Sequence, residues 1–342
     1  MKIGFLGKQN AFALEMLRRL KCEHPEDEFS AWQPGDKAPS TELEVIFASG
    51  NVDRKEIEAQ TKLGLLQMSS AGYDGVDVDA ATKAGIWVAS SPTTKTGNGE
   101  SVAEHAVLLM LAVSRRLNEE RAGTHGHAQV PPKLEVNRAL FGKTACIVGL
   151  GGIGDLIVER LRGFGMILTG VDNHPEHAPN GVKGYGHAEL RLAAADADYL
   201  VLAIPGTKDN ENMIDGTVLS TMKKNAVLVN IGRGTLVDES ALLAAVKSGH
   251  LYGAGLDVVK NEPVSEGNPL LGEPRIFVTP HIAGATDLML DGTVSYLGDV
   301  LSEFRQRIRP GGIVNEPTNP RAPLYASGSH SRARTSTSTD NK

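Results

Sequence analysis

Residues 144–154, TACIVGLGGIG, join a short apolar run to a glycine-rich turn. Gly149, Gly151 and Gly154 fit the pattern G-x-G-x-x-G, which is weak evidence alone in a chain with 38 glycines. Here the pattern follows an expected strand and precedes apolar residues at helical spacing, which is the context of a dinucleotide-binding turn. Such glycines let the backbone approach a pyrophosphate at the helix amino terminus, where unpaired N–H groups favour an anion.

Asp172 ends the next apolar run, 18 residues after Gly154. A carboxylate about 20 residues beyond the glycines binds the ribose hydroxyls of NAD. It would repel the 2′-phosphate of NADP, and neither Asn173 nor His174 supplies an arginine to bind that phosphate. The sequence therefore predicts NAD as the cofactor. The alternative is an ordinary strand-to-helix turn in which Asp172 caps a helix.

Apolar runs and helix-like stretches alternate on both sides of this turn. Six runs between residues 144 and 280 predict the parallel strands of two mononucleotide-binding halves, and four more lie between residues 2 and 91. We therefore predict an α/β protein in which a Rossmann-type doubly wound parallel sheet is inserted into a second, smaller, flavodoxin-like α/β domain.

The same alternation places the domain boundaries. We expect the smaller, substrate-binding domain over residues 1–92, completed by an amphipathic helix over 286–315, and the NAD-binding domain over 93–285. Residues 316–342 are rich in Pro, Ser, Thr and Arg and poor in apolar side chains. Such a segment cannot offset the entropy of ordering, so we expect a disordered tail there.

The composition excludes several classes of function. Of the 342 residues, 41% are hydrophobic and 22% charged, and the net charge of −6 includes no basic stretch, so we expect no nucleic-acid partner. No apolar run approaches the ~20 residues of a membrane span, and the amino terminus lacks the apolar stretch of a secretory signal. We therefore expect a cytoplasmic protein without membrane association, whose two cysteines, Cys22 and Cys146, are thiols.

Three polar residues follow further apolar runs: Arg233 in NIGRGTLVD, Glu262 in DVVKNEP and His281 in TPHIAG. Chemistry in open α/β sheets gathers at the carboxyl ends of strands, so the three can meet over one substrate. An oxo acid needs a cation for its carboxylate and an acid for its carbonyl, which Arg233 and His281 can supply. A carboxylate beside the imidazole raises the pKa of His281. Each residue also has a purely structural alternative: Arg233 as a surface arginine, Glu262 as a solvated loop acid, and His281 as a surface or capped core histidine.

GLGGIG with Asp172, NIGRGTLVDESAL, GLDVVKNEP and TPHIAG, in this order, resemble the D-isomer-specific 2-hydroxyacid dehydrogenases over about residues 2 to 314. The resemblance implies an NAD-dependent enzyme that interconverts a 2-oxo acid, such as glyoxylate, hydroxypyruvate or pyruvate, and its D-2-hydroxy acid, mainly by reduction. Arg233, Glu262 and His281 are then the catalytic trio, with His281 as general acid/base and Glu262 as its orienting partner.

The resemblance also implies ligand contacts. The expected cofactor contacts are Gly149, Gly151, Gly152, Ile153, Gly154, Asp172, Ile204, Pro205, Asn210, Ile231, Gly232, Asp257, Ala283 and Gly284. Among them, Asp257 could accept a bond from the nicotinamide amide. The expected substrate contacts are Ala71, Gly72, Asn98, Ser101 and Arg233. No metal is expected, and the SVAEH helix with its successor implies a homodimer.

Departures from the family pattern leave the substrate open. His125 stands where many relatives have the tryptophan of R-x-G-x-W. We expect no regulatory domain after the last expected helix, unlike in the long phosphoglycerate dehydrogenases. Two other functions use the same scaffold: an NAD(H)-responsive corepressor of the C-terminal binding protein type, and a phosphite dehydrogenase. Formate oxidation is less favoured, because that family pattern usually has Gln in place of Glu262.

Overall fold

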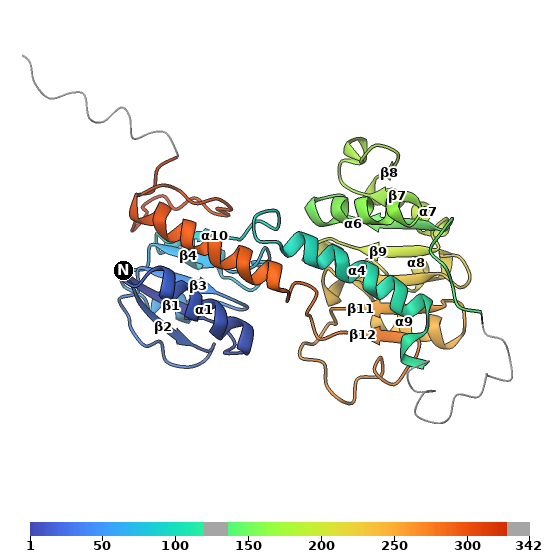
Figure 1. The fold of residues 1–342 in the computed structure, drawn as a ribbon, viewed down its shortest axis with the longest axis horizontal. Coiled ribbons are helices and arrows are strands. Elements are labelled where there is room, and N and C mark those ends of the chain that lie inside the picture. The colour runs from blue at the N-terminus through green and yellow to red at the C-terminus, as the bar shows by residue number, and fades with distance from the viewer. Residues whose placement is uncertain (120–135, 327–342) are drawn as a thin grey trace, which may run out of the picture. The chain divides into compact units, whose positions relative to one another are not determined.

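The structure is a computed structural model that describes residues 1–119 and 136–326. The chain divides into two compact units, one formed by residues 1–98 with residues from 287 onward and the other by residues 99–286. Each unit is a parallel sheet covered by helices, which confirms the α/β prediction (Figure 1). In the part of the chain that is described, no helix combines the length and apolar character that a bilayer crossing requires.

The first unit contains a five-stranded parallel sheet in the order β2-β1-β3-β4-β5. This is the flavodoxin-like order, as predicted. Its strands are β1 Lys2–Leu6, β2 Glu28–Trp32, β3 Val45–Ala48, β4 Leu65–Met68 and β5 Trp87–Ala89. The sequence analysis missed β2, because this edge strand buries little apart from Trp32 and so lacks an apolar run.

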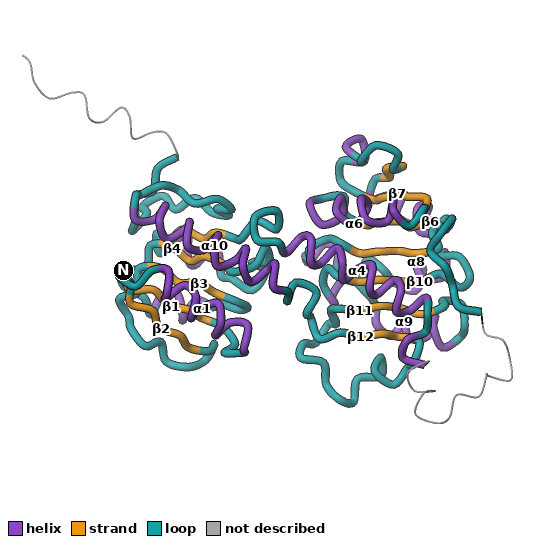
Figure 2. The backbone as a smooth tube through the Cα atoms, in the orientation of Figure 1, coloured by secondary structure: helices purple, strands orange, loops and turns teal. Residues whose placement is uncertain are grey.

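Helices cover both faces of this sheet. One face packs against α1 Ala11–Glu23 and α10 Asp287–Arg305, which lie side by side in Figure 2. The other face packs against α2 Arg54–Glu58 and α3 Val78–Lys83. Asn10 starts α1 by accepting the N–H of Ala13 at 2.9 Å. The long carboxy-terminal helix therefore belongs to the core of the unit that the amino terminus begins.

The boundary between the units falls after residue 98 rather than after the predicted residue 92. Residues 93–98 lie against α10. A Cβ added to Gly292 would meet the carbonyl oxygen of Thr96 at 2.6 Å, and one added to Gly97 would meet Leu288 Cγ at 2.5 Å. Only a residue without a side chain leaves room for this approach, so the segment packs closely against α10 in the first unit.

The prediction of disorder from residue 316 is wrong for residues 316–326. Ala322 and Leu324 are buried in the core of the first unit, and the Trp87 indole N–H donates to the Ala322 carbonyl at 2.9 Å. The backbone N–H of Tyr325 also donates to the Arg307 carbonyl at 2.8 Å, and the Tyr325 carbonyl accepts the N–H of Arg309 at 2.8 Å. The prediction rested on the average composition of the tail, which is polar. That average gave no sign that Ala322 and Leu324 pack against the core of the first unit. Residues 327–342 lie outside the described part of the chain.

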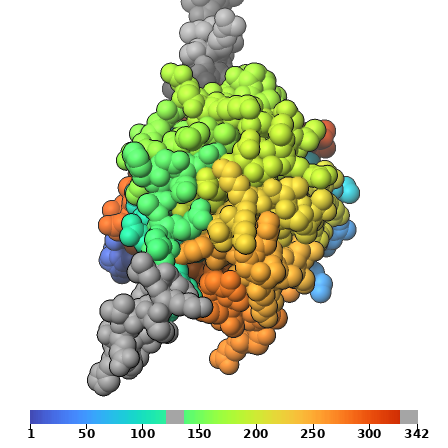
Figure 3. Space-filling model, turned by 90° about the vertical axis from the view of Figure 1, so that its right-hand side faces the viewer, coloured from blue at the N-terminus to red at the C-terminus, as the bar shows by residue number. Residues whose placement is uncertain are grey.

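The second unit contains a seven-stranded parallel sheet in the order β12-β11-β10-β9-β6-β7-β8. The six predicted strands are present, with β8 added at one edge. The strands are β6 Thr144–Val148, β7 Ile167–Val171, β8 Lys183–Tyr185, β9 Tyr199–Leu202, β10 Val227–Asn230, β11 Gly253–Leu256 and β12 Ile276–Val278. In the space-filling view, green, yellow and orange mark successive parts of this unit along the chain (Figure 3).

Two apolar cores lie on the two faces of this sheet, as in a doubly wound fold. One face carries α4 Asn98–Ser114 and α6 Gly152–Gly163. The other carries α7 Leu190–Ala195, α8 Gly216–Thr221 and α9 Glu239–Lys247. The second unit also contains short 3₁₀ helices, which are η1 Pro175–His177, η2 His187–Glu189, η3 Lys208–Asn210 and η4 Gly234–Leu236. Both cysteines are free thiols, and burial raises the pKa of Cys146 to about 11.

Candidate active site

The glycine turn joins β6 to α6 at the point where the strand order reverses. β6 lies between β7, the next strand in sequence, and β9, the third strand after it, so this is the switch point at which ligands bind in open α/β sheets. Gly149 has a φ of +98°, and a Cβ on Gly154 would meet the Gly149 carbonyl oxygen at 1.9 Å. A Cβ on Gly151 would meet nothing within 4 Å. The turn is therefore closely packed on its inner side and open where a pyrophosphate would approach.

Asp172 follows β7, and both of its side-chain oxygens accept backbone hydrogen bonds, one of them from the glycine turn. Oδ2 accepts the N–H of Leu150 at 2.9 Å, and Oδ1 accepts the N–H of His174 at 3.0 Å. Burial alone would raise the pKa of Asp172, but these two hydrogen bonds outweigh burial and lower it. The helix-capping alternative is wrong, since the 3₁₀ helix that follows begins after His174 without a side-chain cap.

The other predicted cofactor residues follow four more strands of the second unit. Ile204 and Pro205 follow β9, Ile231 and Gly232 follow β10, Asp257 follows β11, and Ala283 and Gly284 follow β12. Because all the strands are parallel, these residues share one edge of the sheet with Gly152, Ile153 and the rest of the glycine turn. The Asn210 side chain closes its own loop, donating to the Pro205 carbonyl at 2.9 Å and accepting the Thr207 N–H at 2.7 Å.

The predicted trio lies at the same edge. Arg233 follows β10, Glu262 follows β11 and His281 follows β12. The closest contact joins His281 Nδ1 to Glu262 Oε2 at 2.6 Å. The second oxygen of Glu262 accepts the N–H of Val259 at 3.2 Å, which fixes the orientation of the carboxylate. With Nδ1 engaged, Nε2 of His281 is the ring atom available for proton transfer.

The charges of the trio act on one another. The hydrogen bond that the His281 ring donates to Glu262 raises the pKa of His281. Together with the negative charges of Glu262 and Asp257, it outweighs burial and the Arg233 charge, which both lower that pKa. Burial would raise the pKa of Glu262, but the bond to His281 and the charges of His281 and Arg233 lower it. The imidazolium and carboxylate forms therefore stabilise each other, and the pair keeps a proton on the ring to higher pH than an isolated histidine would.

Asn230, which the sequence analysis missed, fixes the turn that carries Arg233. This buried side chain accepts the N–H of Gly232 at 3.0 Å and donates to the carbonyl of Arg233 at 2.8 Å. A Cβ on Gly234 would lie 1.9 Å from the carbonyl carbon of Val259. Close packing thus requires the glycines on both sides of Arg233. In the sequence, only their positions beside Arg233 indicated such a requirement.

The sequence analysis also missed a hydrogen-bond chain near His281, which is formed by His105, Thr279 and Asp257. The Thr279 hydroxyl donates to Asp257 Oδ1 at 2.6 Å, and Nε2 of His105 lies 2.9 Å from the same hydroxyl oxygen. Because the hydroxyl proton is used by Asp257, His105 Nε2 is the donor in the second bond. Burial lowers the pKa of His105, against the opposing charge of Asp257. The hydrogen bonds therefore place a proton on Nε2, and burial disfavours a second proton on the ring.

The carboxylate of Asp257 organises the loop that carries His281. Its two oxygens accept the N–H groups of Ile282 at 2.9 Å and Ala283 at 3.0 Å, and its carbonyl accepts that of His281 at 2.8 Å. The Asp257 side chain is 1% exposed, and His281 has a φ of +54°. Asp257, expected to bind the nicotinamide amide, thus has a positioning role in the protein itself.

The predicted substrate residues divide between the two units. Ala71 and Gly72 lie in the first unit, in the loop after β4, where Ser70 Oγ donates to the Gly72 carbonyl at 3.2 Å. Asn98 is the first residue of α4. In the second unit, the hydroxyls of Ser101 and Thr286 lie 2.7 Å apart. His125 lies outside the described residues.

Comparisons with known proteins identify the family of this chain. A family model for the NAD binding domain of D-isomer specific 2-hydroxyacid dehydrogenases matches residues 107–283. D-3-phosphoglycerate dehydrogenase of Mycobacterium leprae is 34% identical over 292 residues, which are 82% of this chain and 54% of that protein. The chain thus spans about half the length of these relatives.

Two further relatives match over most of their own length. Glyoxylate reductase of Korarchaeum cryptofilum is 33% identical over 275 residues, which are 80% of this chain and 82% of that protein. The solved NADPH-dependent glyoxylate/hydroxypyruvate reductase of Sinorhizobium meliloti, in complex with NADP and malonate, superposes with a TM-score of 0.79 at 29% identity, over 94% of this chain and 98% of that one. The chain belongs to the D-isomer specific 2-hydroxyacid dehydrogenase family, and residues 107–283 match the NAD-binding domain of that family.

Proposed function

We propose that this protein is an NAD-dependent dehydrogenase that interconverts a 2-oxo acid and its D-2-hydroxy acid. The observation that carries the proposal is the 2.6 Å contact between His281 Nδ1 and Glu262 Oε2 at the carboxyl edge of the NAD-binding sheet. A histidine whose pKa is raised by a carboxylate holds a proton for a carbonyl oxygen, and takes it back in the reverse reaction.

NAD supplies the hydride acceptor of this reaction, and NADH the donor. Gly149, Gly151 and Gly154 fit a bound dinucleotide, because they leave space on the outer side of the turn and close packing on the inner side. The carboxylate of Asp172, ionised and held beside this turn, fits a ribose diol.

During reduction, His281 Nε2 donates its proton to the carbonyl oxygen as the carbonyl carbon gains the hydride, so the products are an alcohol and a neutral imidazole. Glu262 holds the ring and stabilises its charged form before the transfer. Arg233 binds the substrate carboxylate through two parallel hydrogen bonds, for which a planar guanidinium is suited. Asp257 and Thr279 hold the loop that positions His281.

The substrate is a small 2-oxo acid such as glyoxylate, hydroxypyruvate or pyruvate. Two relatives are named for substrates of this kind: one is a glyoxylate reductase and the other a glyoxylate/hydroxypyruvate reductase. We propose that the backbone N–H groups of Ala71 and Gly72 bind the substrate carboxylate and that Asn98 and Ser101 line the nicotinamide side. In this proposal the protein is a cytoplasmic homodimer. Light scattering of the purified chain tests whether it is a dimer.

NADH oxidation by the purified protein across 2-oxo acids of graded size, repeated with NADPH, tests the proposal. We expect turnover of the smallest acids and a preference for NADH, because Asp172 repels a 2′-phosphate. His281→Asn should lower kcat by about 10²-fold or more, the usual contribution of a general acid. His187→Asn, a change at an exposed histidine of the same unit, is the matched control.

Three outcomes would contradict the proposal. Parental turnover in His281→Asn would remove the histidine from the reaction, and a preference for NADPH would overturn the role given to Asp172. Oxidation of phosphite with NAD, or NADH-dependent peptide binding, in a protein that reduces no 2-oxo acid would favour one of the other functions of this scaffold.

A further inference from the structure

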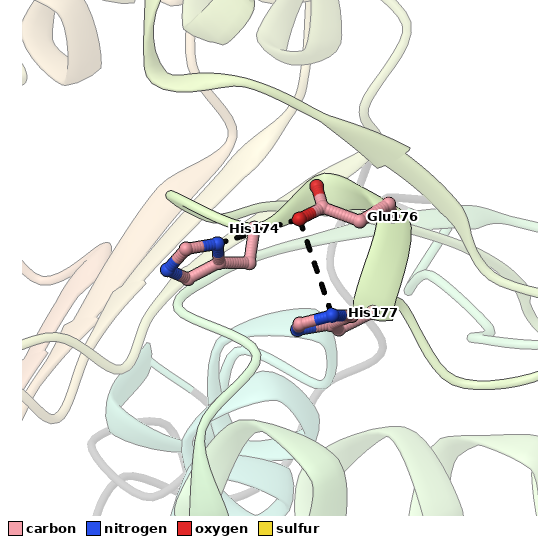
Figure 4. A group of neighbouring side chains, drawn as sticks. All are labelled: His174, Glu176 and His177. Carbon is pink, nitrogen blue, oxygen red and sulfur yellow. Dashed lines mark hydrogen bonds and ion pairs between the residues drawn. The ribbon is translucent and has the colours of Figure 1, made fainter.

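Two histidines and a glutamate gather on the turn between β7 and β8. His174 and His177 flank Pro175 and Glu176, and all three polar side chains are exposed. Figure 4 shows the carboxylate of Glu176 directed toward both imidazoles (Figure 4). Nδ1 of His174 lies 3.4 Å from Glu176 Oε1, and Nε2 of His177 lies 4.0 Å from the same oxygen.

The backbone of this turn holds the two rings on one side. Residues 175–177 form the 3₁₀ helix η1, in which residues three apart in sequence lie one above the other. The N–H of His177 donates to the carbonyl of His174 at 2.9 Å, and the two rings stack with centroids 5.5 Å apart and planes 24° from parallel. The arrangement of the imidazoles thus follows from the local fold.

The turn is held at two points. Asp172 accepts the N–H of His174 at 3.0 Å, and the ring of Pro175 fixes φ at that residue. A Cβ on Gly184 in β8 would meet the Pro175 carbonyl oxygen at 2.2 Å, so the turn lies directly against that strand. Anchoring of this kind reduces the entropy lost when the three side chains bind one ligand.

The three side chains form a ligand set suited to a divalent transition metal. Imidazole nitrogen and carboxylate oxygen are common zinc ligands, with bonds of about 2.0 to 2.2 Å. Two ligands at tetrahedral angles on such an ion lie about 3.3 Å apart. The distance from His174 Nδ1 to Glu176 Oε1 is already 3.4 Å, and all three donor atoms lie within 4.8 Å of one another. Small side-chain rotations therefore suffice to close the set.

A second group of possible ligands, His24, Glu26 and Asp27 in the first unit, is less suited. It has one imidazole instead of two. Asp27 already accepts hydrogen bonds from the amino terminus, at 2.8 Å, and from Arg305, and Arg305 also pairs with Glu26 at 2.7 Å. Two cations therefore occupy the carboxylates that an ion would need.

We propose that His174, Glu176 and His177 bind one divalent transition-metal ion of the zinc type, with water completing the coordination. This site is separate from the catalytic trio and requires neither NAD nor a 2-oxo acid. It adds a metal to a protein for which the family resemblance implied none.

Isothermal titration of Zn²⁺ into the EDTA-treated, dialysed full-length protein tests the site. We expect an equivalent of zinc that depends on these three residues. His174→Asn, His177→Asn and Glu176→Gln should each raise the Kd for that equivalent by about tenfold or more, because each removes one of three ligands. Melting curves in EDTA should match the parental curve for all three variants, since the side chains are exposed.

Glu26→Gln is the matched control, because it makes the same chemical change in the second group and should leave the titration unchanged. The proposal is overturned if the parental protein binds no zinc, or if the His174→Asn/His177→Asn double variant keeps the parental stoichiometry and Kd. It is also overturned if Glu26→Gln, and not Glu176→Gln, removes the equivalent.

Discussion

Replacing Thr279 with valine removes one hydroxyl from the centre of the chain that joins His105 to Asp257. In the parental protein this hydroxyl donates to Asp257 Oδ1 at 2.6 Å and accepts from His105 Nε2 at 2.9 Å. Valine keeps the shape of threonine, so the change tests these two hydrogen bonds with little change in packing.

The expected cost follows from the two bonds. A hydrogen bond to a charged group contributes about 1.5 to 3 kcal/mol, and a buried donor left without a partner costs about 1 to 3 kcal/mol. Because Thr279 is only half-buried and water can replace part of the loss, we expect a total of about 2 to 3 kcal/mol. For a domain of this size, such a change lowers the Tm by roughly 5 to 10 °C.

Urea unfolding followed by far-UV circular dichroism measures this loss in the purified protein. Thr279→Ser is the control, because it keeps the hydroxyl and removes only a methyl group, at a cost of about 1 kcal/mol. The reasoning is refuted if Thr279→Val and the parental protein share one urea midpoint, or if the serine variant loses as much stability as the valine variant.

Three other changes test the site and the first unit. Glu262→Gln removes the charge that raises the pKa of His281, so the loss of reductase activity with rising pH should begin at lower pH in a kcat/KM profile; an unchanged profile would contradict the pairing. Arg233→Lys should raise the KM for glyoxylate by about tenfold or more and leave the Kd for NADH unchanged, because an ammonium cannot form the two parallel bonds; equal KM values would exclude the contact. Leu324→Ala should lower the free energy of unfolding by about 2 to 4 kcal/mol in urea titrations followed by tryptophan fluorescence, because this residue is 5% exposed. Leu14→Ala, at a residue 50% exposed, should lower it by about 0.5 kcal/mol or less. Similar losses in the two variants would show that the tail is not part of the core.

The order of strands and helices could be predicted because burial on both faces of a parallel sheet leaves apolar runs in the sequence. Where burial is partial the signal is lost. β2 and β8 are edge strands, and β8, KGY, buries only Tyr185 well. Composition failed in another way at Ala322 and Leu324, because an average over a polar tail conceals two buried residues.

The trio could be placed from the sequence because each member directly follows a strand, and the carboxyl ends of parallel strands share one edge. The residues that position the trio leave no such pattern. His105 meets Thr279 across 174 residues of chain, and no spacing rule joins a helix residue to a strand end so far away. Asn230 lies inside a motif whose glycines and arginine gave the stronger signal. Partners of this kind become visible only in three dimensions.

The interrupted course of the first unit dictates the order in which the protein can fold on the ribosome. Its sheet is complete when residue 89 has been synthesised, yet α10, which covers one face together with α1, emerges only after all of residues 99–286. The second unit is continuous and can fold as soon as it leaves the exit tunnel, ahead of the unit that begins the chain. A nascent chain arrested before residue 287 therefore exposes the apolar face that α10 would cover, which is the state of this protein most prone to aggregate.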